Sequence, residues 1–142
     1  HSTENLDGMG RRAHMYRKVG DEFIADDFAH EQSVVFETGK GLVIFNSCSH
    51  GGIVNIVREV QMALGGQKVY AVVGGFHMMK LSGMDTLAIP EEEVVETAQE
   101  LKGLGVEEIY TGHCTGNIAF RILKKELGEM VHALGTGETV VF

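Results

Sequence analysis

Several residue types are scarce or missing in this sequence of 142 residues. It has no tryptophan, one proline and only two cysteines. Two cysteines without a recognisable secretory leader make a poor disulfide framework, so Cys48 and Cys114 point to thiol chemistry or metal binding instead. No apolar run approaches the roughly 20 residues that a membrane-spanning helix needs. We therefore expect a cytoplasmic protein.

Positive charge is also in short supply. Lysine and arginine number 12 against 20 acidic residues, which gives a net charge of −8. Such a field repels phosphate backbones and anionic lipid, and no lysine-rich run overrides it locally. We therefore expect neither nucleic acid nor membrane as a partner. The 44% of hydrophobic and 23% of charged residues are typical of a globular domain.

Apolar periodicity predicts alternating strands and helices, and hence an α/β fold with a mixed sheet covered by helices. Two strands, at 33–37 and 42–46, are expected on either side of a glycine-rich turn. Further strands are expected at 69–73, 108–111, 130–134 and 138–142. Helices are expected at 53–64, 91–104 and 117–127. Residues 78–89 are expected to form a loop. Residues 1–25 are weakly patterned and are expected to be an N-terminal arm or linker.

Three of the expected strands run out into a motif that contains a histidine. The motifs are Ser47-Cys48-Ser49-His50, Gly74-Gly75-Phe76-His77 and Gly112-His113-Cys114-Thr115-Gly116. Crossover connections place the loops after consecutive parallel strands at one edge of a sheet. We therefore expect these three loops to converge on one site.

Imidazole and thiolate are the ligands that zinc and related divalent metals favour. His50 and His113 are the leading candidates, because each ends a buried strand beside a cysteine and glycines. His77 lacks a thiol neighbour, so it is assigned to substrate binding or to orienting a ligand. A lone loop histidine is usually a hydrogen-bonded surface group, and we interpret His1, His14 and His132 in this way.

The remaining residues of the three motifs leave alternatives open. Cys48 is either a ligand or a small buried apolar residue. Because neighbouring side chains alternate in direction along an extended chain, we expect Cys114 to point to a different side from His113, and we interpret it as a structural residue. Thr115 can cap the helix that begins near Gly116, and a helix N-terminus can receive an anionic group of the substrate.

The quoted motifs, together with Gly41-Leu-Val-Ile-Phe-Asn before the first of them, resemble those of a known family. The sequence is similar to metallo-β-lactamase-fold hydrolases, in the branch of the dihydropterin-ribofuranosylaminobenzene phosphate synthase-like proteins. The resemblance covers about residues 26–142. It implies half of an αββα sandwich whose strand-end loops hold one or two divalent metals, with zinc as the usual ion and iron or manganese as alternatives.

The resemblance also implies a set of metal ligands. By similarity these are His30 before a strand, Cys48 or His50 at the end of the next strand, and His113 as the final histidine. His30 is a candidate only through the resemblance. No catalytic acid or base is assigned.

The superfamily signature His-x-His-x-Asp-His, which lies in the N-terminal half, occurs nowhere in this sequence. The chain therefore resembles the C-terminal half alone, and we expect it to be part of a longer product. Its sheet face should bind the missing N-terminal half or a second copy of the chain. Alone, we expect it to be inactive and to bind metal weakly or not at all.

The leading function is metal-dependent hydrolysis, in which a metal-bound hydroxide attacks a small-molecule ester, lactone or phosphoester. One alternative is a non-catalytic anion-binding or assembly module. Another is a transferase that acts on a phosphorylated pterin-type substrate, which the name of the resembled branch suggests.

Overall fold

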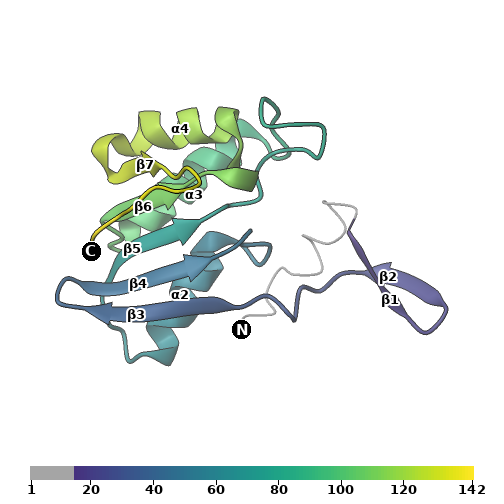
Figure 1. Ribbon diagram of the computed structural model, residues 1–142, viewed down its shortest axis with the longest axis horizontal. Helices are drawn as coiled ribbons and strands as arrows, with labels where there is room; N and C mark the ends of the chain where they lie inside the picture. The colour runs from purple at the N-terminus through teal and green to yellow at the C-terminus, as the bar shows by residue number, and fades with distance from the viewer. Residues whose placement is uncertain (1–14) are drawn as a thin grey trace.

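A mixed five-stranded sheet forms the centre of the protein (Figure 1). The computed structural model describes residues 15–142, so His1 and His14 lie outside the described residues. The strands lie in the order β3-β4-β5-β6-β7, and β3 is antiparallel to β4 while the others run parallel. Their bounds are β3 Ser33–Thr38, β4 Gly41–Asn46, β5 Val69–Gly74, β6 Glu108–Thr111 and β7 Val131–Ala133.

The β3–β4 hairpin confirms the strand pair predicted around the glycine-rich turn. Its register pairs Thr38 with Gly41 at the turn. Gly41 adopts a φ of +133°, and a Cβ there would lie 2.8 Å from the carbonyl oxygen of Lys68. A side chain would therefore push β4 away from the start of β5. Beyond the turn, the three apolar residues of β4 from Leu42 to Ile44 are almost fully buried, as expected for a central strand.

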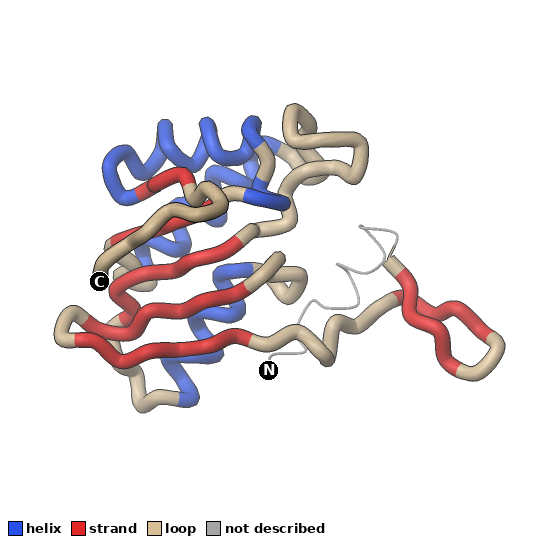
Figure 2. The backbone as a smooth tube through the Cα atoms, viewed as in Figure 1, coloured by secondary structure: helices blue, strands red, loops and turns tan. Residues whose placement is uncertain are grey.

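In the described part of the chain, the helices α2, α3 and α4 cover one face of the sheet (Figures 1 and 2). They are α2 Ile53–Ala63, α3 Glu91–Gly103 and α4 Asn117–Leu127. In each helix the apolar stripe that predicted it points inward, with Ile56, Ala98 and Leu123 buried in the core. Helix α3 begins after Pro90 with three glutamates in its first turn, where the helix dipole favours negative charge.

The opposite face of the sheet carries aromatic and branched side chains, and no helix of residues 15–142 covers it. Val34 and Phe36 on this face are 55% and 56% exposed. The C-terminal Phe142 lies edge-on against Phe45 and Tyr110, at ring-centroid distances of 6.0 and 5.5 Å. The tail therefore covers only part of an apolar surface.

The C-terminal end of the described chain differs from the prediction, and the predicted N-terminal arm contains a hairpin. Residues 138–142 were expected to pair as a strand, but they make no strand and β7 is the last one. Within the predicted arm, β1 (Tyr16–Val19) and β2 (Glu22–Ala25) form an antiparallel hairpin. This hairpin extends away from the main sheet (Figure 1). In the described part of the chain, no helix has the length and apolar character required to cross a membrane.

Candidate metal centre

The loops after β4, β5 and β6 meet at one edge of the sheet, where the three parallel strands end. Hydrogen bonds join them directly: the Gly75 N–H donates to the Ser47 carbonyl at 2.7 Å, and the Met78 N–H donates to the Cys114 carbonyl at 2.9 Å. The convergence predicted from the strand-end motifs is therefore present in the structure.

Cys48, His113 and Cys114 bring their ligand atoms together, all within 4.8 Å of one another. Cys48 is half-buried, His113 is exposed and Cys114 is buried. Around a tetrahedral zinc ion, ligand atoms at 2.0–2.3 Å from the metal lie about 3.8 Å apart or slightly less. A closing movement of about 1 Å would therefore bring both thiols and the imidazole to one ion, and these ligand types suit zinc.

Cys114 was predicted to point away from His113, and this prediction is wrong. Residues His113–Thr115 form a short 3₁₀ helix, η1, so the alternation of side chains along a strand does not apply to them. Burial and the neighbouring Cys48 thiol raise the pKa of Cys114 to about 12. Without a cation, the Cys114 thiol therefore stays protonated at neutral pH. A divalent metal would stabilise its thiolate.

His50 is held by Glu31 and Phe28 beside this cluster. Its ring stacks on Phe28 at a centroid distance of 4.3 Å and an interplanar angle of 6°. Glu31 accepts hydrogen bonds from the backbone N–H groups of His50 and Gly51, at 2.7 and 2.9 Å, and its Oε1 lies 3.0 Å from His50 Nδ1. Burial alone would raise the pKa of Glu31, but these hydrogen bonds outweigh burial and lower it. Sequence reasoning missed Glu31.

His77 lies next to His50, with 4.5 Å between the ring centroids. Burial and the charges of His50 and His113 lower the pKa of His77, while Glu31 opposes the shift. His77 therefore favours its neutral form, in which one ring nitrogen can bind a metal or accept a proton. The three histidines predicted at the strand ends thus lie near one another.

His30 lies apart from the thiol cluster. Its side chain is 71% exposed, and its Nδ1 lies 3.9 Å from Asp26 Oδ1. Its ring centroid is 6.0 Å from that of Phe28. His30 therefore neighbours the His50 side of the site, and its predicted role as a ligand stays a prediction.

Thr115 and Gly116 pack the loops against one another. The fully buried Thr115 hydroxyl accepts the Phe76 N–H at 2.9 Å and lies 2.6 Å from the Thr111 hydroxyl. It does not cap α4, because the N-cap residue of this helix is Gly116 and α4 begins at Asn117. A Cβ on Gly116 would lie 2.7 Å from the Met79 Cβ, so the loop 78–89 lies close against this turn. Their predicted contact with substrate stays a prediction.

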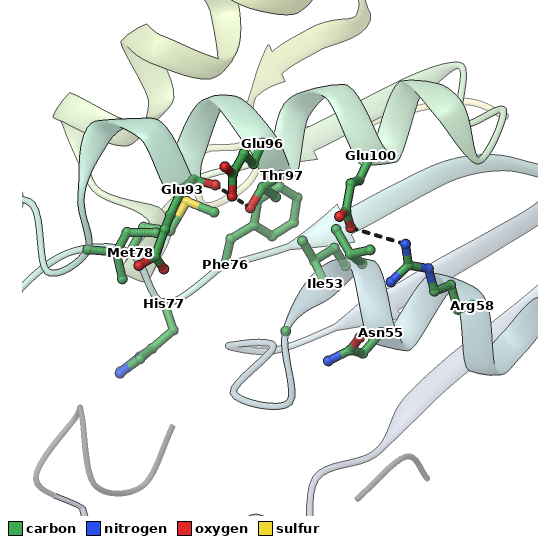
Figure 3. A pocket seen from close by; sticks show the side chains of 13 residues that line it. Ile53, Asn55, Arg58, Phe76, His77, Met78, Glu93, Glu96, Thr97 and Glu100 are labelled. Atoms are coloured by element: carbon green, nitrogen blue, oxygen red, sulfur yellow. Dashed lines mark hydrogen bonds and ion pairs between the residues drawn. The ribbon is translucent and has the colours of Figure 1, made fainter. Parts of the chain in front are cut away.

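A cleft of about 470 Å³ runs between α2 and α3 and reaches His77. Figure 3 shows Glu93, Glu96 and Glu100 along its α3 side, and Arg58 of α2 pairs with Glu100 at 3.3 Å. The His77 ring points away from α3 in this view. His77 thus lines the cleft, while its ring points away from the acidic residues of α3.

The chain matches known proteins in sequence and in structure. One relative is a Methanocaldococcus jannaschii protein named 7,8-dihydropterin-6-methyl-4-(beta-D-ribofuranosyl)-aminobenzene-5'-phosphate synthase. The two sequences are 36% identical over 128 residues, and the aligned region covers 90% of this chain and 41% of the relative. It matches the crystal structure of Tm1679, described as a metal-dependent hydrolase of the β-lactamase superfamily. That match has a TM-score of 0.78 and 30% identity, over 89% of this chain and 46% of the other. No protein-family model matches.

The chain is therefore similar in sequence and in fold to part of a metallo-β-lactamase superfamily protein, which confirms the predicted resemblance and the mixed α/β fold class. Within that superfamily it is similar to the phosphate synthase from M. jannaschii. It spans less than half the length of both relatives. One of these relatives is named as a hydrolase and the other as a synthase, so both relatives are enzymes.

Proposed function

We propose that this chain supplies part of the active site of a metal-dependent hydrolase. The observation that carries the proposal is the meeting of two thiols and an imidazole, from Cys48, His113 and Cys114, within 4.8 Å at the carboxyl edge of a parallel sheet. The proposed ligand set is the predicted His30, Cys48, His50 and His113 together with Cys114, which we include because its sulfur lies within 4.8 Å of the ligand atoms of Cys48 and His113. The expected ions are one or two divalent metals, with zinc favoured over iron or manganese because of the thiols.

A divalent metal at this edge would activate a water molecule and polarise the ester, lactone or phosphoester bond that is attacked. The chain's own residues would hold and surround that ion. Cys48 and His113 lie where solvent and substrate can reach them, while the buried Cys114 lies behind them. His77, held neutral beside His50, is placed to bind substrate or to accept a proton.

The test uses the protein expressed from its complete gene, because this chain alone is expected to be inactive. Bound metal is counted by elemental analysis, and hydrolysis is assayed on chromogenic esters, lactones and phosphodiesters. We expect near-stoichiometric metal, and its loss with the activity in Cys48→Ser and His113→Asn. Lys80→Gln, on the loop beside the site, is the matched control and should change neither. A metal content of about a tenth of an equivalent or less in the wild type, with no hydrolysis, contradicts the proposal.

The exposed face of the sheet is the proposed attachment surface for the rest of the fold or for a second copy. Val34 and Phe36 lie on it beside the partly covered Phe45. Exposed apolar surface of this kind favours association, because burying it removes apolar area from water. Phe36→Lys should abolish self-association of the isolated chain in sedimentation velocity. Leu81→Lys, which changes an 85% exposed residue on the loop 78–89, is the control.

A second candidate function is group transfer to or from a phosphorylated pterin-type substrate. The name of the M. jannaschii relative supports it. A transferase and a hydrolase differ in the acceptor, so the assay follows one labelled substrate and separates the hydrolysed product from the transferred product. Formation of the hydrolysed product alone supports the leading proposal. A product that joins two organic substrates supports the second.

A further inference from the structure

A buried carboxylate lies behind His50. The Glu31 side chain is 4% exposed and comes from the segment before β3, 19 residues away in sequence. We propose that Glu31 is a positioning residue that fixes His50 in the tautomer protonated at Nδ1, so that Nε2 is the nitrogen that binds metal. The metal-binding part rests on the proposed function, whereas the tautomer itself does not.

The position of the proton follows from the partners of Glu31. Its two oxygens receive the backbone N–H groups of His50 and Gly51, and Oε1 also faces His50 Nδ1 at 3.0 Å. An ionised carboxylate only accepts hydrogen bonds, so Nδ1 has to carry the proton of this contact. In the neutral imidazole the other nitrogen, Nε2, then has a free lone pair.

The orientation of the ring is fixed from two directions. Phe28 stacks on the ring at 4.3 Å and sets the plane in which it lies. Glu31 sets the rotation within that plane, because the same oxygen binds both the ring and the backbone of His50. Imidazole ligands of metals generally donate their second N–H to a carboxylate or carbonyl oxygen, which fixes both tautomer and direction.

Sequence reasoning left open whether Cys48 or His50 is the metal ligand at the end of β4. The thiol of Cys48 lies in the cluster with His113 and Cys114, whereas His50 lies beside His77 with its own carboxylate support. The two residues therefore need not compete for one position. In the proposed site they supply two adjacent parts.

The tautomer is tested first in the metal-free wild-type protein, by ¹⁵N NMR of the histidine ring nitrogens at a pH where His50 is neutral. We expect a protonated Nδ1 and an unprotonated Nε2. A protonated Nε2, or a rapid average of the two tautomers, overturns the proposal. This measurement does not require any variant to fold.

The positioning role is tested with Glu31→Gln, whose amide can donate as well as accept and so no longer enforces one tautomer. We expect the Kd for zinc to rise about 10- to 100-fold, and Glu31→Asp to restore part of the affinity. The matched control is Glu108→Gln, because Glu108 also contacts an imidazole, that of His132, at 2.6 Å. It should leave the zinc Kd unchanged.

The positioning role of Glu31 and the proposed function can fail separately in these experiments. An unchanged zinc Kd in Glu31→Gln, in a protein that binds zinc, overturns the positioning role. If the complete protein binds no divalent metal, the proposed function fails and the His50 tautomer alone decides the role of Glu31. If Glu31→Gln does not fold, Glu31→Asp and the wild-type spectrum carry the test.

Discussion

Replacing Gly75 with alanine should disturb the thiol cluster without touching a ligand. An alanine Cβ at this position would lie 2.5 Å from the Sγ of Cys114 and 3.1 Å from the Ser47 carbonyl oxygen. Ordinary contacts between such atoms lie at about 3.5–4.0 Å, so the sulfur would have to move by about 1 Å. Cys114 is buried and the Gly75 N–H is bonded to Ser47, so neither side yields freely.

The expected loss in the free energy of unfolding follows from this overpacking. Forcing an extra methyl group into a packed interior costs about 1–3 kcal/mol of the free energy of unfolding. With a urea m-value of about 2 kcal/mol/M, the unfolding midpoint should fall by about 0.5–1.5 M. Because the sulfur moves by a large part of a metal–ligand bond length, the zinc affinity should fall about 10-fold or more.

The assay combines urea unfolding with a zinc titration of the protein from the complete gene. The control is Gly103→Ala, at the last residue of α3, where an added Cβ meets no atom within 4 Å. Alanine is the better helix former by up to about 1 kcal/mol, so this variant should be unchanged or slightly more stable. A Gly75→Ala protein with wild-type midpoint and wild-type zinc affinity would refute the reasoning.

Three further predictions concern the core, the buried carboxylate and the buried thiol. Leu101 is fully buried, so Leu101→Ala should lower the free energy of unfolding by about 3–5 kcal/mol in urea titrations, and a loss below about 1 kcal/mol would contradict the packing described. Because the folded pKa of Glu31 is lowered, its stabilisation is complete above the unfolded pKa and is lost as pH falls through the folded value. Urea midpoints should therefore converge for wild type and Glu31→Gln below about pH 4, and a constant gap would count against this linkage. In the metal-free protein, iodoacetamide at pH 8 should alkylate Cys48 well before Cys114, because Cys114 is buried and its raised pKa keeps the thiol protonated. Equal rates in a mass-spectrometric time course would be inconsistent with the burial.

The regular elements of the fold could be predicted from the sequence because their signals are local. β-Branched and aromatic runs around a glycine-rich turn predicted the β3–β4 hairpin, and apolar patterns of period 3.6 predicted the three helices close to their observed bounds. The patterns failed at the ends. Residues 138–142 have strand-forming residues, but their aromatic end packs on the sheet face through Phe142 instead of pairing. The β1–β2 hairpin is mostly exposed, so it has no buried face to give an apolar pattern.

The candidate site could be predicted only in part, for reasons that are also physical. Strand-end histidines were recognisable because parallel strands bring their carboxyl ends together. Cys114 was misjudged because a 3₁₀ turn replaces the strand alternation that the prediction assumed. Glu31 could not be recognised at all, since a glutamate in a loop is normally solvated. Only the folded chain brings its carboxylate to the N–H groups of His50 and Gly51.

The strand-end loops also have an unusual backbone, with consequences for any attempt to stabilise this protein. Among the described residues, the only non-glycine residues with positive φ are Phe28, Ser49, His77 and His113, at 49–52°. All four belong to the site or adjoin it, and left-handed backbone of this kind costs about 1 kcal/mol or more per residue. Glycine at position 77 or 113 would relieve that cost while deleting the imidazole. A screen for heat resistance alone would therefore enrich variants that have lost an imidazole of the proposed metal centre. Such a screen should also select for retention of the metal.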